Sequence, residues 1–254
     1  MRVHVAFTPG EAFQADEGAK PAHPQGGNVS VAAGAPVGIV VDVLRATSTI
    51  AQALASGYER VYSCAEIEEA LALREHLGEG LLGGERNAVK IEGFDVGASP
   101  REFCGGPRAR TAIFSTTNGT RAILESAAHC EEVLLGSLLN LDAVAAAARE
   151  RGQDVSLLCA GFHGTFALDD AYCAGRIVQL LGGEATDSSK AADAIARAWP
   201  DAHDGLLART YGPPRLEEDI AFCAQVSVLD VVPRLSRMVE GAAEITSAPL
   251  DSKP

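Results

Sequence analysis

Short apolar runs alternate with amphipathic stretches along most of the chain. Runs rich in Val, Ile and Leu, such as GIVVDVL (38–44) and DVSLLCAG (154–161), show no regular polar alternation. This is typical of strands in a sheet that is covered on both faces. The first run leads into STIAQALASG (48–57), whose apolar positions have helical spacing. The pattern predicts an α/β fold with three α/β/α layers and a largely parallel or mixed central sheet.

The alternation continues along the chain, and most later strands are followed by a helical pattern. Further strands are predicted at RVYSC (60–64), TAIFSTT (111–117), EEVLLGS (131–137) and VSVLDVVP (226–233). Helical patterns lie at residues 65–78, 118–128, 140–152, 168–183, 188–199 and 216–225.

These elements predict a single domain over residues 1–240, built as one body or as two closely packed lobes. A stretch rich in Gly, Ala and Pro at about 11–36 is expected to be a surface excursion from the first strand. Residues 241–254 are expected to form a loose C-terminal tail.

Composition narrows the possible partners. The chain has 254 residues, is 47% hydrophobic, and carries a formal net charge of −13. This charge argues against nucleic acid and anionic membranes, which require a basic surface. An anionic substrate would therefore need a local basic pocket or a metal ion.

The six cysteines are scattered without CxxC or zinc-type spacing, so we expect reduced thiols. The N-terminal MRVHVAF alternates like a strand and lacks the features of a signal peptide, and no apolar run approaches the length of a membrane span. We therefore expect a cytoplasmic protein, and base rates favour a homodimer.

Polar residues gather where the predicted strands end. In open α/β sheets, ligands bind beyond the carboxyl ends of the strands, where helix N-termini favour anions. Four such exits are polar, and we expect them to face one crevice: residues 42–49, 83–90, 115–121 and 161–170.

The first exit places Asp42 at the end of an apolar strand. A buried carboxylate must be paired or bound to a cation. Asp42 is thus an ion-pair partner of Arg45, a helix cap, a metal ligand or a nucleophile. Arg45 is suited to grip a phosphate or sulfonate with two hydrogen bonds, and Thr47 or Ser48 to cap the next helix.

The second and third exits add cationic and hydroxyl groups. Glu85 is a candidate ligand for a hard cation, and Arg86 and Lys90 are candidates to neutralise an anion; the alternative for each is a surface salt bridge. The stretch STTNGTR (115–121) resembles a phosphate cradle, although Asn118-Gly119 is also an ordinary turn signal.

The fourth exit has Asp169 and Asp170 at a helix start. They either complement the helix dipole or complete an oxygen-rich Mg²⁺ site with Asp42 and Glu85. His163 is either a well-placed imidazole or a loop residue without a role, and we favour the second interpretation.

Five blocks between Val41 and Pro233 resemble the 2-phosphosulfolactate phosphatase family: VDVLRATSTI, GGERNAVKIEGFDVGASP, STTNGTRAI, the stretch 161–175, and EEDIAFCAQVSVLDVVP. The resemblance implies a three-layer α/β fold and Mg²⁺-dependent hydrolysis of 2-phospho-3-sulfolactate to 3-sulfolactate and phosphate, a step toward coenzyme M. The family motifs have Gly, Asn, Glu and Asp where this chain has Ala88, Ala98, Asp169 and Ser227. These differences indicate a tolerant scaffold or an altered substrate pocket.

The resulting hypothesis is a phosphomonoesterase that acts on a small phosphate ester. Asp42, Glu85 and one or both of Asp169 and Asp170 would hold Mg²⁺. The proposed catalytic residues are Asp42, Arg45 and Lys90, with Asp42 as the candidate nucleophile if an aspartyl-phosphate forms. Substrate binding is assigned to Arg86, Thr117, Asn118, Gly119, Thr120, Arg121 and Gly164.

Two alternatives belong to other classes of protein. One is a non-catalytic or altered-specificity binder of phosphorylated or sulfonated metabolites. The other is a nucleotide-using transferase, which the lack of a Walker motif and of a GxGxxG fingerprint disfavours.

Overall fold

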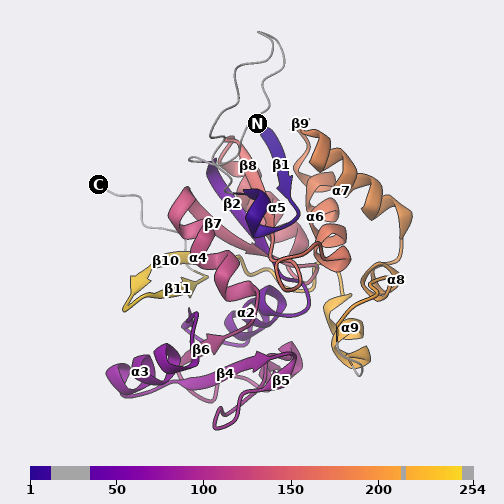
Figure 1. Ribbon diagram of the computed structural model, residues 1–254. Coiled ribbons are helices and arrows are strands. Elements are labelled where there is room, and N and C mark those ends of the chain that lie inside the picture. Colours follow the sequence, from indigo (N-terminus) through magenta and orange to yellow (C-terminus); the bar gives the residue numbers. More distant parts are fainter. Residues whose placement is uncertain (13–34, 213–215, 248–254) are drawn as a thin grey trace.

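A computed structural model of the protein describes residues 1–12, 35–212 and 216–247 (Figure 1). Most of the expected surface excursion, residues 13–34, lies outside this part, as do residues 248–254 of the expected tail. The described residues form a central sheet with helices on both faces, so the predicted three-layer α/β fold is confirmed.

Eleven strands of the described chain form the sheet, in the order β5-β4-β6-β3-β11-β10-β7-β2-β8-β1-β9. Their bounds are β1 Arg2–Ala6, β2 Ala35–Val41, β3 Arg60–Ser63, β4 Leu81–Arg86, β5 Val89–Lys90, β6 Thr111–Ser115, β7 Cys130–Gly136, β8 Val155–Cys159, β9 Glu184–Ala185, β10 Arg234–Val239 and β11 Ala242–Thr246.

The sheet consists of two parallel halves joined by an antiparallel hairpin. One half contains β4, β6 and β3, and the other contains β7, β2, β8, β1 and β9. The β10–β11 hairpin lies between them and pairs antiparallel with β7 on one side and β3 on the other. Three antiparallel ladders thus separate the halves, so β3 and β7 run in opposite directions.

Helices cover both faces of the sheet (Figure 1). The helices are α1 Pro9–Ala12, α2 Ala46–Ala55, α3 Ile67–Leu77, α4 Gly119–His129, α5 Leu141–Glu150, α6 Leu168–Leu181, α7 Asp187–Ala198, α8 Ala202–Leu207 and α9 Glu217–Cys223, with a 3₁₀ helix η1 at Pro100–Phe103.

Strand β2 shows why its sequence is apolar at consecutive positions. Ile39 packs into a core with α5, α6 and α7, whereas Val40 packs into a second core with α2 and α4. Successive side chains of a strand point to opposite faces, so both faces must be apolar when both are covered. A third cluster lies under α3.

Two predictions for the C-terminal part are wrong. Residues 226–233 form no strand, because Ser227 has a left-handed φ of 53°. The backbone of this segment is bonded instead to the loop after β7, where the Ser227 N–H donates to the Leu138 carbonyl at 2.9 Å. Residues 242–246, expected in the loose tail, form β11 in the middle of the sheet. The buried Glu244 of β11 accepts hydrogen bonds from Tyr62 and Arg237.

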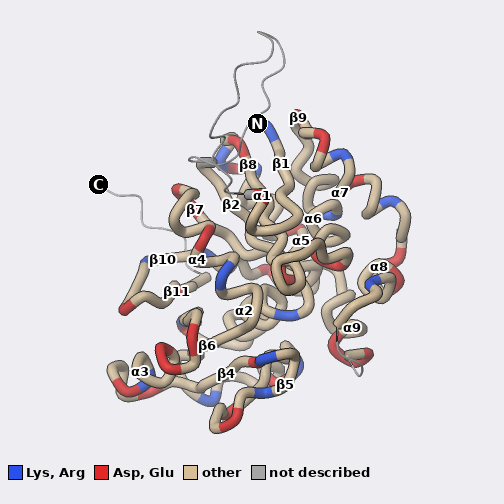
Figure 2. The backbone as a smooth tube through the Cα atoms, viewed as in Figure 1, with Lys and Arg blue, Asp and Glu red and all other residues tan. Residues whose placement is uncertain are grey.

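The charged residues are interspersed. In Figure 2 the Lys and Arg positions lie among Asp and Glu positions along the backbone. Among the described residues, no helix has both the length and the apolar character needed to cross a membrane.

Candidate active site

A cavity of about 200 Å³ lies where the ends of both half-sheets meet. Asp42 follows β2 and Phe162 follows β8, whereas Glu85 is the penultimate residue of β4 and Thr117 follows β6. The expected convergence of polar strand exits is therefore present, although the exits belong to two half-sheets rather than to one edge of a single parallel sheet. The remaining lining residues are Leu44, Arg45, Ala46, Asn87, Ala88, Ala98, Thr116, Asn118, His163, Asp169, Arg209, Tyr211, Gly212 and Leu216.

Asp42 is buried at the base of this cavity. Its Oδ1 accepts a hydrogen bond from the Ala46 backbone N–H at 3.1 Å. Helix α4 begins so close to it that a Cβ on Gly119 would lie 2.6 Å from Asp42 Oδ2, so only glycine fits there. Burial raises the pKa of Asp42 to about 7, the Ala46 hydrogen bond opposes this rise, and the charges of Glu85 and Asp169 add to it.

Glu85 ties two loops together. Its Oε1 accepts the Thr117 N–H at 2.9 Å, and its Oε2 accepts the Ala88 N–H at 2.5 Å. The carboxylate thereby fixes the turn between β4 and β5 against the loop before α4. Asn87 and Ala88 in that turn both have left-handed backbones, with φ of 54° and 60°.

The two acids at the start of α6 have different environments. Asp169 lines the cavity and accepts hydrogen bonds from the Tyr211 hydroxyl and the Asp170 N–H, and burial raises its pKa. Asp170 does not line the cavity. Its two oxygens accept the N–H groups of Val43 at 2.9 Å and Gly161 at 3.0 Å. Burial, with the charges of Asp169 and Asp42, raises the pKa of Asp170 well above its usual range.

Asp170 is therefore a positioning residue in this geometry, and its expected role beside Asp169 as a metal ligand stays a prediction. It links the loop after β2 to the loop after β8, and so holds Asp42 near Asp169. Both carboxylate oxygens are already used for this purpose.

Arg45 lines the cavity and is held there by an ion pair. Its Nη1 lies 2.6 Å from Asp219 Oδ2, and its Nη2 donates to Ala88 O at 3.4 Å. Asp219 belongs to α9 and also accepts a hydrogen bond from Ser99 Oγ. The ion pair of Arg45 with Asp42 was one of the alternatives for Asp42, and in the structure Arg45 instead pairs with the first turn of α9.

Several predicted binding residues lie outside the cavity. Arg86, Arg121 and Gly164 line a neighbouring, more open cavity of about 480 Å³, and Lys90 lines neither. Arg86 donates to Ser115 Oγ at 2.8 Å and to Ala65 O at 3.2 Å, which draws it away from Asp42. The structure therefore does not bring Arg86, Lys90 and Arg121 into the cavity of Asp42, and their expected roles stay predictions.

The loop before α4 is divided between structural and cavity-facing groups. The Thr120 hydroxyl is buried against Ser63 and Thr116, so it does not reach the cavity. Thr117 and Asn118 line both cavities. Thr117 Oγ1 is buried and has no hydrogen-bond partner in the described part of the chain.

Sequence reasoning missed Arg209 and Tyr211, which lie between α8 and α9. Tyr211 bonds to Asp169 and stacks against Phe162 with ring centroids 4.8 Å apart. His163, interpreted as a loop residue without a role, also lines the cavity, and its N–H donates to Asn118 Oδ1 at 3.2 Å. No predicted strand precedes Arg209, so the rule that polar residues at strand ends form the site could not identify it.

Two positions where the chain departs from the family motifs differ in location. Ala98 lines the cavity, and its carbonyl accepts a hydrogen bond from Thr49 Oγ1 at 2.7 Å. Ser227 lies in the segment beside α5, where its Oγ accepts the Asp142 N–H at 3.1 Å. The first difference therefore changes the pocket, and the second changes the scaffold.

The charges of the cavity suit a divalent cation. Three carboxylates face two guanidinium groups, and the charge of one of these, Arg45, is already offset by Asp219. Carboxylate oxygens are the ligands that Mg²⁺ prefers, and Mg²⁺ usually takes one or two of them together with water and substrate oxygens. Asp42, Glu85 and Asp169 are the carboxylates of the cavity that could supply such oxygens, although their oxygen atoms do not all lie within 4.8 Å of one another.

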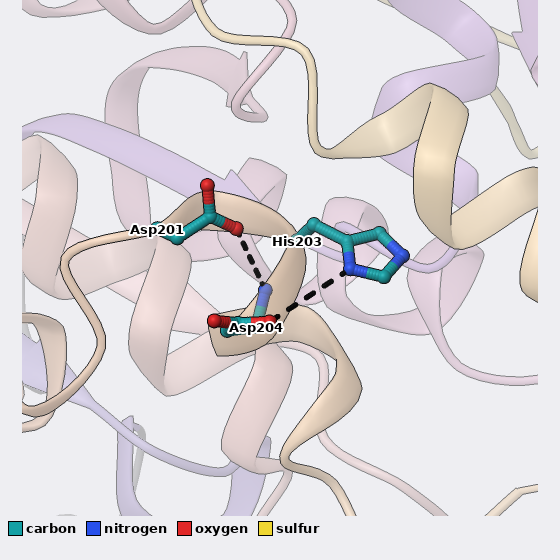
Figure 3. Close-up of side chains that lie close together, drawn as sticks. All are labelled: Asp201, His203 and Asp204. Atoms are coloured by element: carbon teal, nitrogen blue, oxygen red, sulfur yellow. Dashed lines mark hydrogen bonds and ion pairs between the residues drawn. The ribbon is translucent and has the colours of Figure 1, made fainter.

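A tighter cluster of potential ligands lies elsewhere. In the described residues, only Asp201, His203 and Asp204 bring three candidate ligand atoms within 4.8 Å of one another (Figure 3). Asp201 is the N-cap of α8, and its Oδ1 accepts the Asp204 N–H at 3.0 Å. This arrangement is a helix cap, and none of its three residues lines the cavity.

The fold and the cavity together define a class of protein. Buried carboxylates beside guanidinium, amide and hydroxyl groups form a donor set suited to enzymes that act on phosphoryl groups. A family model described as 2-phosphosulpholactate phosphatase matches residues 25–238. The chain belongs to the 2-phosphosulfolactate phosphatase family, as the resemblance predicted, and its expected enzyme class, phosphoric monoester hydrolase, is the class of that family.

Several relatives carry the corresponding name, "Probable 2-phosphosulfolactate phosphatase". The protein of Caldanaerobacter subterraneus subsp. tengcongensis is 41% identical over 209 residues, which cover 78% of this chain and 86% of the relative. The protein of Carboxydothermus hydrogenoformans is 38% identical over 221 residues, covering 84% and 91%. The protein of Thermus thermophilus is 41% identical over 207 residues, covering 78% and 86%.

Proposed function

We propose that this protein is a Mg²⁺-dependent phosphomonoesterase for a small anionic phospho-hydroxy acid. The first candidate substrate is 2-phospho-3-sulfolactate, which would yield 3-sulfolactate and phosphate. The observation that carries the proposal is the meeting of Asp42, Glu85 and Asp169 with Arg45 in one small cavity. The family membership and the names of the relatives support the choice of substrate.

Asp42, Glu85 and Asp169 are the residues that would hold Mg²⁺. When bound, the ion would offset their negative charge and act as a Lewis acid toward the phosphoryl oxygens. Without a cation, three carboxylates facing two arginines would repel a phosphate dianion, because like charges in a buried site are poorly screened.

The other cavity residues supply hydrogen bonds to the phosphoryl group. Arg45 is held by Asp219 and presents its remaining N–H groups. Asn118 accepts the His163 N–H through Oδ1, so its amide N–H₂ is the group oriented for an acceptor. The unpaired hydroxyl of Thr117 provides a further donor. Phosphoryl transfer depends chiefly on positioning and charge stabilisation of this kind.

Measuring phosphate release tests the proposal. We expect hydrolysis of 2-phospholactate and 2-phosphosulfolactate with Mg²⁺, loss of activity in EDTA, and a loss of at least about 1000-fold in Asp42→Asn. The control is Asp187→Asn, since the Asp187 side chain is fully exposed on α7. Near-normal turnover by Asp42→Asn would exclude the proposed site. Full activity in EDTA would remove Mg²⁺ from the proposal.

The role of Asp42 as nucleophile is a separate question. If Asp42 attacks phosphorus, the alcohol leaves, and water then cleaves the aspartyl-phosphate. A single turnover in H₂¹⁸O, followed by peptide mass spectrometry, would place solvent oxygen in the Asp42 carboxylate when water attacks its carbonyl carbon. A trapped phosphorylated Asp42 would support the same step, whereas solvent oxygen found only in the released phosphate, with no trapped adduct, would favour direct attack by water.

If the protein binds 2-phospholactate measurably but does not hydrolyse it, the alternative of a non-catalytic or altered-specificity binder is supported. The feature relevant to that alternative is Ala98, which lines the cavity where the family motif has Asn.

A place in coenzyme M biosynthesis and a cytoplasmic location are part of the phosphatase proposal. The six free thiols are consistent with a reducing compartment.

A further inference from the structure

Arg209 is a cavity residue that forms no ion pair within the described chain. We infer that it recognises a second acidic group of the substrate, a carboxylate or sulfonate on the alcohol part of the ester. This inference rests on the function proposed above. It would make Arg209 the residue that distinguishes phosphorylated hydroxy acids from simple alkyl phosphates.

The contacts of Arg209 leave part of its guanidinium group unpaired. Its Nη1 donates to Tyr211 O at 2.6 Å, and its Cζ lies 5.9 Å from the centre of the Tyr211 ring. Its Nε is buried and has no hydrogen-bond partner within the described residues. A buried, unpaired N–H of a charged group is costly, so an acceptor from a ligand would be stabilising there.

Arg45 and Arg209 differ in their ion pairs. The charge of Arg45 is offset by Asp219 at 2.6 Å, whereas Arg209 has no carboxylate within 4.0 Å in the described part of the chain. Asp169, an acid of the same cavity, is already bonded to the Tyr211 hydroxyl and to the Asp170 N–H. Arg209 is therefore the guanidinium group of the cavity without a carboxylate in direct contact, although its charge still opposes the rise in the pKa of Asp169.

Tyr211 fixes the position of this charge. Its hydroxyl is bonded to Asp169 at the start of α6, and its ring packs against Phe162. The backbone carbonyl of the same residue holds Arg209. The guanidinium group is thus attached to the wall that carries Asp169, in a cavity of about 200 Å³ that suits a small ester with two anionic groups.

A matched pair of substrates isolates the second acidic group. In 2-phospholactate the ester carbon bears a carboxylate, and in isopropyl phosphate a methyl group takes its place. The quantity to measure is the ratio of kcat/KM for the two esters with Mg²⁺. We expect Arg209→Gln to lower this ratio about 100-fold, mainly through a higher KM for 2-phospholactate, because a charge-assisted pair is lost.

Two further variants complete the experiment. Arg209→Lys keeps the charge but not the planar fork, so we expect a fall of about 10-fold in the ratio. Arg197→Gln on α7, where the side chain is 72% exposed, should keep the wild-type ratio. A change of less than about 3-fold in Arg209→Gln would overturn the inference. If circular dichroism shows that this variant does not fold, the same criterion applies to Arg209→Lys.

Calorimetry separates this inference from the proposed function. If the wild-type protein hydrolyses neither of these esters nor 2-phosphosulfolactate, the proposed function fails, and titration with 2-phospholactate and isopropyl phosphate in MgCl₂ still tests Arg209. Tighter binding of 2-phospholactate that is lost in Arg209→Gln would support recognition of the second acid. Equal changes for both ligands would contradict it.

Discussion

Ala88 occupies a turn position that favours glycine. Its φ of 60° is left-handed, and its N–H is bonded to Glu85, so the surrounding structure fixes this conformation. An L-residue pays about 1 kcal/mol for such a backbone. We therefore expect Ala88→Gly to raise the free energy of unfolding by about 0.5–1 kcal/mol in urea titrations.

The control for this substitution has the opposite sign. Ala128→Gly lies on the exposed side of α4, where glycine weakens a helix, and should lower stability by about 1 kcal/mol. A loss of stability in both variants would show that the backbone at residue 88 is not strained.

Asp42 should make the stability of the metal-free protein depend on pH. Its pKa is raised to about 7, mainly by burial, from an ordinary value of 3.8. Between these values the folded protein holds a proton that the unfolded chain releases. The stabilising contribution is therefore full below about pH 4 and is lost as the pH rises through 7.

Asp42→Asn removes this titration. In EDTA we expect the variant to gain up to about 4 kcal/mol over the wild type at pH 8, and little at pH 4. Urea unfolding at both pH values measures the difference. An equal gain at pH 4 and pH 8 would contradict the assigned cause.

Part of the site was predictable at this scale, because polar residues that directly follow buried strands lie at the ends of those strands, where ligands bind in α/β sheets. Asp42, Glu85, Asn118 and Asp169 were all found from this pattern and line the cavity. Arg209 was not, because its position depends on how the α8–α9 segment packs against α6, which no local pattern shows.

At the scale of elements, α9 supplies the counter-charge of the cavity. A helix was predicted at residues 216–225, but the pairing of Asp219 with Arg45 was not, since 174 positions separate them. Asp219→Asn would leave the buried Arg45 without a compensating charge. We expect a loss of about 3 kcal/mol in the free energy of unfolding, together with lower phosphatase activity.

Glu218→Gln is the matched control on the same helix. The Glu218 side chain is 76% exposed and pairs with Arg101 on the surface. Its loss should cost less than about 1 kcal/mol. Equal costs for the two substitutions would indicate that the Asp219 pair is no stronger than a surface salt bridge.

The two wrong strand predictions, one for a strand that does not form and one for a strand that was missed, have a physical explanation at this scale too. The segment 226–233 has the composition of a strand, but the left-handed Ser227 and the missing N–H of Pro233 prevent a regular ladder. Strand β11 contains two alanines and a glutamate, and it is stable because β3 and β10 bury it on either side. Such pairing depends on distant strands.

At the scale of the whole molecule, the β10–β11 hairpin holds the half-sheets together. Ile245 is fully buried and pairs with Val61 and Leu235. Ile245→Asp would place a charge in this junction, at a cost of several kcal/mol. We expect the two halves to lose their common unfolding transition. Met238→Asp is the control, since Met238 of β10 is 47% exposed.

The single tryptophan makes this loss measurable. Trp199 packs against the core of the β1–β2–β8 half, so its fluorescence reports that half, whereas far-UV circular dichroism reports both. The two urea transitions should coincide in the wild type and in Met238→Asp, and separate in Ile245→Asp. Coincident transitions in all three proteins would mean that other contacts between the halves are sufficient.

The place of the hairpin also bears on synthesis at the ribosome. Residues 234–246 follow every other described strand along the chain, yet they pair with β3 and β7 in the interior of the sheet. Until they emerge, a nascent chain has two unpaired strand edges, and such edges recruit neighbouring chains. We therefore expect the edges of β3 and β7 to stay open to neighbouring nascent chains until the hairpin has been synthesised.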